Sequence, residues 1–152
     1  MESAVQGMEQ AANHYNQDLE AMTEAQILGS AAGSARKPVD FTYEVAFINR
    51  RIAARLSGTD PQPMPTGDEW IVAPKELQSK AAISEYMRTA CQDLIDAAKA
   101  LPEDEGGKMF GPAGNERPAF DFVYFASMHT MYHDAQLNFI QSLTGDLAVH
   151  WK

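Results

Sequence analysis

The stretch that decides the fold is residues 119–143, AFDFVYFASMHTMYHDAQLNFIQSL. Its apolar side chains recur at intervals of three and four residues, which is the spacing of one face of an α-helix. Gly145 follows shortly after the last turn, where a glycine commonly ends a helix. The sequence therefore predicts one long helix over residues 119–143. Its apolar positions are Phe122, Phe125, Ala126, Tyr132, Leu137, Ile140 and Leu143.

The first half of the chain predicts two further helices of this kind. Residues 2–22 carry apolar side chains at intervals of three and four residues, which predicts a helix. Residues 29–35 are rich in Gly and Ser, which destabilise a helix, so we expect a linker there. The next helix opens near Pro38, with Asp40 as a candidate N-cap, and it ends before Gly58. Its apolar stripe is Phe41, Val45, Ile48, Ile52 and Leu56.

Two long connections flank a fourth predicted helix. Residues 59–74 contain four prolines, which remove backbone donors and fix φ, so this run is a connection. We expect its apolar segment 70–72 to fold back onto the core. A helix follows Pro74 and ends at Leu101, and residues 103–118 form the second connection. The stripe of this helix is Leu77, Ala81, Ser84, Cys91, Ile95 and Ala98.

These segments predict an all-α fold, a four-helix bundle with long connections between helices two and three and between helices three and four. No repeat of fixed period is present, and no alternating run is long enough to predict a sheet. At 152 residues the chain is one domain long, so we expect a single domain over residues 1–152.

Charge and composition exclude several classes of partner. The chain has 12 Lys and Arg against 21 Asp and Glu, a formal net charge of −9, which repels nucleic acid and anionic lipid. No stretch approaches the ~20 apolar residues of a membrane span. Cys91 is the only cysteine, and the N-terminus lacks the apolar core of a signal peptide, so we expect a cytoplasmic protein. The sequence does not decide between a monomer and a homodimer.

Two histidines stand on the apolar face of the last helix. His129 and His133 line up with Phe122 and Ala126 at the centre of that face, one turn apart, so both imidazoles can ligate one cation such as zinc. The alternative is a pair of core histidines whose nitrogens bond to hydroxyls or water. We favour a metal, because it satisfies two buried imidazoles at once. Gln136 lies one turn beyond His133, where its amide can bond a metal-bound water or orient a ligand.

Glu44 is the natural third ligand. It flanks the buried stripe of the second helix, where a carboxylate is costly unless it is paired or binds a cation. With His129 and His133 it makes a two-histidine, one-carboxylate set that leaves coordination positions open. The alternative is an ion pair with Arg51 or Arg55 on its own helix. Asn49 and Tyr43 are lower-ranked pocket residues, and His14 lies off its helix stripe, where we expect it on the surface.

Two segments together resemble the DinB-like superfamily of bacterial four-helix proteins. They are HTMYHDAQLNFI, residues 129–140, in the last helix and ARKPVDFTYEVAFINRRI, residues 35–52, in the second helix. The resemblance implies a divalent metal bound by two histidines of the last helix and a histidine near the start of the second helix. This chain has Glu44 where that third histidine is expected, and the change alters the charge and metal preference of the site.

The resemblance also implies a class of reaction. Some members transfer or use low-molecular-weight thiols such as bacillithiol or mycothiol, and a related member is a maleylpyruvate isomerase. Our first hypothesis is therefore an enzyme with a divalent metal, zinc or nickel, that activates a thiol or water against a small-molecule electrophile. The second hypothesis is a non-catalytic helical bundle whose metal site has changed from that of the family. Such a bundle would bind a small molecule or a partner helix.

Overall fold

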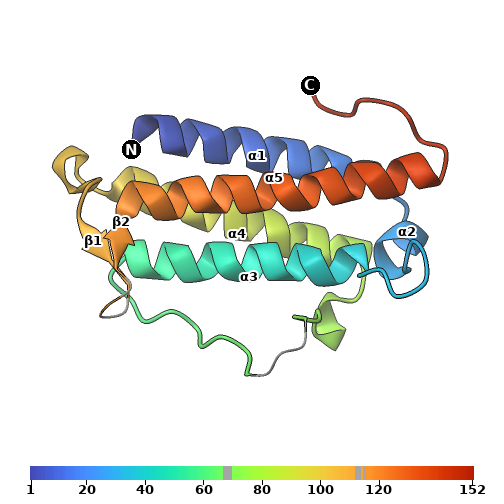
Figure 1. Ribbon diagram of the computed structural model, residues 1–152, viewed down its shortest axis with the longest axis horizontal. Coiled ribbons are helices and arrows are strands. Elements are labelled where there is room, and N and C mark those ends of the chain that lie inside the picture. The colour runs from blue at the N-terminus through green and yellow to red at the C-terminus, as the bar shows by residue number, and fades with distance from the viewer. Residues whose placement is uncertain (67–69, 112–113, 115) are drawn as a thin grey trace.

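The computed structural model describes residues 1–152 except 67–69, 112–113 and 115. Four long helices lie side by side and make up most of the described chain (Figure 1). They are α1 (Glu2–Ala21), α3 (Pro38–Leu56), α4 (Lys80–Ala100) and α5 (Ala119–Leu143). The predicted all-α four-helix bundle is confirmed, and α5 has the bounds that its sequence predicts.

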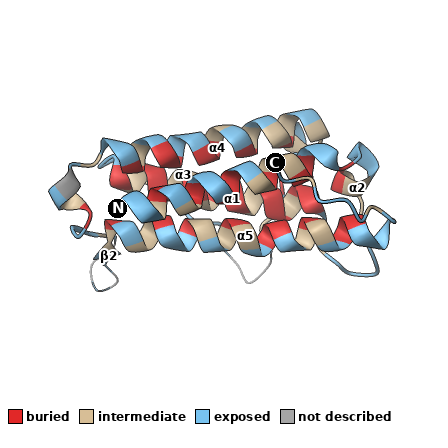
Figure 2. Ribbon diagram, turned by 90° about the horizontal axis from the view of Figure 1, so that it is seen from above, coloured by how far each residue is buried: buried red, intermediate tan, exposed pale blue. Residues whose placement is uncertain are grey.

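The long helices form a ring in which α1 and α3 each contact both α4 and α5. Figure 2 shows the buried residues on the faces that the helices turn toward one another. Burial of this apolar surface is the main driving force for folding. Because α3 and α5 are neighbours in the ring, their side chains can meet between them. The largest fully buried side chains include Tyr15, Phe41, Met8, Leu19, Met22, Ile27, Ile83, Met87, Leu94 and Leu137.

Several short elements join the long helices. They are α2 (Glu24–Leu28), the 3₁₀ turns η1 (Lys75–Leu77) and η2 (Glu103–Glu105), and the antiparallel strands β1 (Met109–Phe110) and β2 (Arg117–Pro118). The apolar spacing of the sequence did not predict α2 or the two strands. A local signal for α2 exists, since the side chains and backbones of Thr23 and Gln26 cap each other at its start. The strands are too short for an alternating pattern.

The predicted N-cap of α3 is wrong. Pro38 is the first helical residue and Lys37 precedes it, so the helix begins two residues before Asp40. The Asp40 carboxylate instead accepts a hydrogen bond of 3.0 Å from the backbone N–H of Ala73. This bond ties the end of the long connection to α3.

The prediction that residues 70–72 fold onto the core is also wrong. Trp70 is 70% exposed and Val72 is 64% exposed, and only the next residue, Ala73, joins the core. The guanidinium of Arg36 lies 4.6 Å from the Trp70 ring centroid. The indole therefore packs on a cation at the surface.

Helix α4 begins later than predicted. It starts at Lys80, where the Ser79 side chain accepts a hydrogen bond of 3.2 Å from the backbone N–H of Ala82. Leu77 lies in a 3₁₀ turn before it, and Ala81 is exposed, so the predicted stripe is wrong at its start. The buried residues of α4 are Ile83, Met87, Ala90, Cys91, Leu94, Ile95 and Ala98.

The predicted buried face of α5 is partly wrong. Phe125, Tyr132 and Leu143 are 47%, 62% and 54% exposed. Apolar residues occur around much of this helix, so their spacing alone does not identify the inward face. Even so, no helix within the described residues is long and apolar enough to cross a membrane. The buried residues are Ala119, Val123, Ala126, Thr130, His133, Asp134, Leu137, Ile140 and Gln141.

The C-terminal segment returns along α1 after α5 ends (Figure 1). The Trp151 ring stacks on His14 with centroids 4.4 Å apart, and Trp151 Nε1 donates to Oδ2 of Asp18 at 2.5 Å. His14 is therefore half-buried under the indole, and its predicted place on the open surface is wrong.

Candidate metal centre

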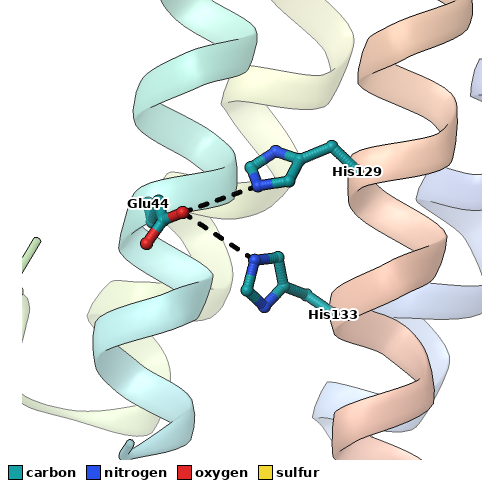
Figure 3. Close-up of side chains that lie close together, drawn as sticks. All are labelled: Glu44, His129 and His133. Carbon is teal, nitrogen blue, oxygen red and sulfur yellow. Dashed lines mark ion pairs between the residues drawn. The ribbon is translucent and has the colours of Figure 1, made fainter. Parts of the chain in front are cut away.

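Three potential metal ligands meet between α3 and α5 (Figure 3). Oε1 of Glu44 lies 3.6 Å from Nε2 of His129 and 3.9 Å from Nε2 of His133. One ligand atom from each residue lies within 4.8 Å of the other two. The structure thus brings together the three residues that the sequence analysis selected as metal ligands.

His133 is buried and held in one orientation. Its Nδ1 lies 2.8 Å from Oε1 of Gln136, and because an amide oxygen only accepts hydrogen bonds, Nδ1 carries the hydrogen. The lone pair is then on Nε2, which faces Glu44. Burial lowers the pKa of His133 to about 4, so the imidazole is neutral near pH 7, as a metal ligand must be. Gln136 therefore lies next to His133 and holds the orientation of its ring.

His129 lies at the flank of the buried face of α5, with its side chain 15% exposed, and its predicted central position is wrong. Its ring stacks on Phe125, with centroids 5.6 Å apart and planes inclined by 11°. The rings of His129 and His133 are nearly perpendicular, at 80°. Nδ1 of His129 is buried without a hydrogen-bond partner, while Nε2 faces Glu44.

Glu44 forms an ion pair that the sequence analysis did not predict. Its Oε2 lies 2.5 Å from Nη2 of Arg36, a residue of the segment before α3, and not beside Arg51 or Arg55. Arg36 also donates to the carbonyl of Ile71 at 3.4 Å. The His129 ring and, after it, the Arg36 guanidinium hold the pKa of Glu44 down to about 2, against the opposing effect of burial. Glu44 is therefore ionised at neutral pH.

The donor set fits a divalent first-row ion. Two imidazole nitrogens and one carboxylate oxygen suit such ions, and in a tetrahedral site with bonds of ~2.0–2.1 Å the ligand atoms lie about 3.3 Å apart. The glutamate–histidine distances of 3.6 and 3.9 Å exceed this value, and the three ligand atoms together lie within 4.8 Å of one another, so the side chains must close in on an ion. Oε1 of Glu44 is free of Arg36, which binds the other oxygen. The residues present can hold the ion with small side-chain movements.

Asn49 and Tyr43 lie apart from these three ligands. The Asn49 amide is buried and donates to Sγ of Cys91 at 3.6 Å, on the side of α3 that faces α4. The Tyr43 ring packs against Phe47 and Tyr86. The structure therefore places neither of these lower-ranked residues in the cluster.

A second polar group lies next to His133, between α5 and α1. Asp134 and Asp18 are both fully buried, and neither Asp134 oxygen has a hydrogen-bond partner. Burial, followed by the neighbouring Asp18 carboxyl, raises the pKa of Asp134 to about 8. Asp18 accepts hydrogen bonds from Asn138 and Trp151. Nothing in the residue spacing identified this pair, because the two carboxyls come from opposite ends of the chain.

Comparison with known proteins supports the fold. The profile of the DinB superfamily matches residues 8–137. A DinB-like protein from Bacillus cereus ATCC 10987 superposes with a TM-score of 0.73 at 13% identity, over 98% of this chain and 95% of that chain. A conserved protein from Enterococcus faecalis superposes with a TM-score of 0.69 at 14% identity, over 93% and 95%.

A third solved structure is a mycothiol-dependent maleylpyruvate isomerase. Its TM-score is 0.63 at 15% identity, over 90% of this chain and 60% of that chain. No curated protein is significantly similar to the chain in sequence.

Proposed function

The chain belongs to the DinB superfamily, and on this premise we propose that it is a metal-dependent enzyme that activates a low-molecular-weight thiol for transfer to a small electrophile. Glu44, His129 and His133 hold the divalent ion, zinc or nickel. The convergence of these three side chains, with ligand atoms within 4.8 Å of one another, is the observation that carries the proposal. Thiol dependence is named for one protein of similar fold, the mycothiol-dependent isomerase.

A divalent ion held by these residues would supply Lewis acidity, which would lower the pKa of a coordinating thiol toward neutral pH. The residues of the chain prepare the site for it. Gln136 keeps the hydrogen of His133 on Nδ1, so Nε2 is always free to bind. Arg36 fixes one oxygen of Glu44 and leaves the other directed at the histidines.

The overall reaction is a displacement at the electrophilic carbon. The thiol proton passes to solvent, the sulfur forms a bond to carbon, and the bond from that carbon to its leaving group breaks with the electron pair going to that group. With Glu44, His129 and His133 as its protein ligands, a bound ion would have open positions for the thiol. No charge change of His133 is needed, because its imidazole is neutral throughout.

The ion pair between Arg36 and Glu44 favours a second candidate. A carboxylate already neutralised by a guanidinium does not need a metal, and the same three side chains could then bind a small molecule without catalysis. The two candidates differ in one measurable property, because only the enzyme has an activity, and that activity depends on a divalent ion.

The test is a conjugation assay. Protein reconstituted with zinc or nickel is incubated with mycothiol, bacillithiol or cysteine and a chromogenic aryl halide, and product is compared with buffer and with chelated protein. We expect acceleration that the chelator abolishes, in the parent chain and in the His150→Ala control but not in His129→Ala/His133→Ala. Equal rates in chelated and loaded protein with every thiol would favour the non-catalytic candidate.

A further inference from the structure

A cavity of about 290 Å³ opens between the second half of α3 and the first half of α5. Three arginines line it, Arg51 and Arg55 from α3 and Arg117 from β2, together with a single carboxylate, Asp121. The rest of the lining is apolar and includes Ile48, Ile52, Phe122 and Phe125. Such a concentration of positive charge is unexpected in a chain of net charge −9.

The three arginines form no salt bridge within the described residues, although the Asp121 carboxylate lines the same cavity. None of Arg51, Arg55 and Arg117 forms an ion pair there, although the other described arginines, Arg36, Arg50 and Arg88, each do. Nη1 of Arg51 is buried and has no hydrogen-bond partner.

Two of these cations also repel each other. Arg51 and Arg55 stand one turn apart on the same helix, and like charges at this spacing destabilise a helix. Burial, and then the charge of Arg55, lowers the pKa of Arg51. The Arg55 guanidinium lies over the Phe122 ring at 5.6 Å, which directs it along the cavity wall. An anion between the two guanidinium groups would relieve the repulsion and accept their hydrogen bonds.

The cavity adjoins the candidate metal centre. Phe125 lines it and stacks on His129. Ile48 also lines it and follows Glu44 by one helical turn, a rise of about 5–6 Å. A ligand with its anionic group among the arginines therefore extends its apolar body toward the three potential metal ligands.

We propose that this cavity binds a small organic anion with an apolar body, and that this anion is the substrate presented to the metal centre. Its role as substrate rests on the proposed function, whereas its binding does not. The volume is near the lower limit of pockets that hold drug-sized ligands, roughly 300–1,000 Å³, so the ligand is small. Arginine forks bind carboxylate and phosphate alike, and these two head groups are separate arms of the test.

The test measures binding to metal-free protein by calorimetry at low ionic strength. The probes are benzoate, phenyl phosphate and the neutral analogue benzamide. We expect at least one of the two anions to bind, at least about tenfold more tightly than benzamide, because charge-assisted hydrogen bonds to guanidinium groups are stronger than bonds to a neutral amide. The anion that binds more tightly identifies the head group.

The variant Arg51→Gln/Arg55→Gln should weaken anion binding by about tenfold or more. Arg117→Gln, at an exposed position, should weaken it without disturbing the helix packing. The matched control is Arg50→Gln, on the same helix but paired with Asp93, which should change the affinity less than about twofold. Benzamide binding as tightly as the anions, no binding of either anion, or an equal loss in Arg50→Gln would overturn the proposal.

Failure of this inference is distinguishable from failure of the proposed function. If the protein binds the anion but takes up no metal, the proposed anion site is supported and the proposed metal-dependent activity is contradicted. If the protein takes up metal but binds neither anion, the anion site is contradicted and the proposed metal centre is not.

Discussion

Arg36 binds Oε2 of Glu44 at 2.5 Å and leaves Oε1 facing the two histidines of α5. One oxygen of the Glu44 carboxylate is thus paired with the Arg36 guanidinium, and the other is available to a metal ion. This arrangement supports a metal, because Oε1 is preoriented. It also opposes a metal, because the guanidinium charge lies close to the ion. The metal affinities of Glu44 and Arg36 variants separate these two effects.

Metal content should depend on the two histidines. Protein expressed without a tag should carry about one equivalent of a divalent first-row ion, and His129→Ala/His133→Ala should carry less than about a tenth of that. The measurement is elemental analysis, with His150→Ala as the matched control. Equal content in the double variant and the parent chain would contradict the ligand assignment.

Replacement of Glu44 should weaken metal binding without unfolding the chain. Glu44→Gln keeps the shape but loses the charge, so we expect a loss of affinity of about tenfold or more, while Glu44→His restores a ligand of the kind the family resemblance implies. Competition with a metal-sensitive dye measures the affinity, and circular dichroism checks the helices. An unchanged affinity in Glu44→Gln would mean that Glu44 serves only as the partner of Arg36.

Removal of Arg36 should act in the opposite direction. Arg36→Gln frees the second oxygen of Glu44 and removes a positive charge beside the ion, so metal affinity should rise by roughly three- to tenfold. The same dye competition measures it, and Arg88→Gln, an arginine on the exposed side of α4, is the control. A weaker metal affinity in Arg36→Gln would show that orientation of Glu44 outweighs the repulsion.

Burial of neutral His133 should cost stability in acid. Its pKa in the folded chain is about 4, below the ordinary value near 6.5, so the unfolded chain takes up the proton first as the pH falls. In chelated protein, the free energy of unfolding of the parent should therefore fall relative to His133→Gln between about pH 6.5 and 4, by roughly 1–3 kcal/mol. Urea unfolding at several pH values tests this, and a constant difference would contradict it.

The buried carboxyl of Asp134 should lower the stability of the folded chain at high pH, whereas His133 lowers it at low pH. Its pKa is raised to about 8, so the folded chain keeps a proton that the unfolded chain has lost, and stability falls as the pH rises toward 8. Chelated Asp134→Asn should melt at a higher temperature than the parent at pH 8.5, with a smaller gap at pH 5. Asp104→Asn, at an exposed position, should not differ from the parent at either pH. If the difference in melting temperature between Asp134→Asn and the parent is the same at both pH values, ionisation of Asp134 is not its cause.

Local signals in the sequence predicted the four long helices and the spacing of the two histidines. Pro38 and Gly145 act on their own neighbours, through a fixed φ and a left-handed turn with φ of 90°, so their effects can be read locally. The one-turn separation of His129 and His133 likewise follows from helix geometry alone. These features need no knowledge of the neighbouring helices.

Tertiary structure alone decided which polar groups meet. Arg36 and Glu44 pair across the start of α3 although they lie eight residues apart, and the carboxyl groups of Asp18 and Asp134 come together only because α1 packs on α5. The buried face of α5 also depends on tertiary contacts. Apolar residues occur around much of that helix, and the helices packed against it determine which of them are buried. Periodicity describes one helix at a time, whereas burial and pairing depend on contacts between residues far apart in the chain.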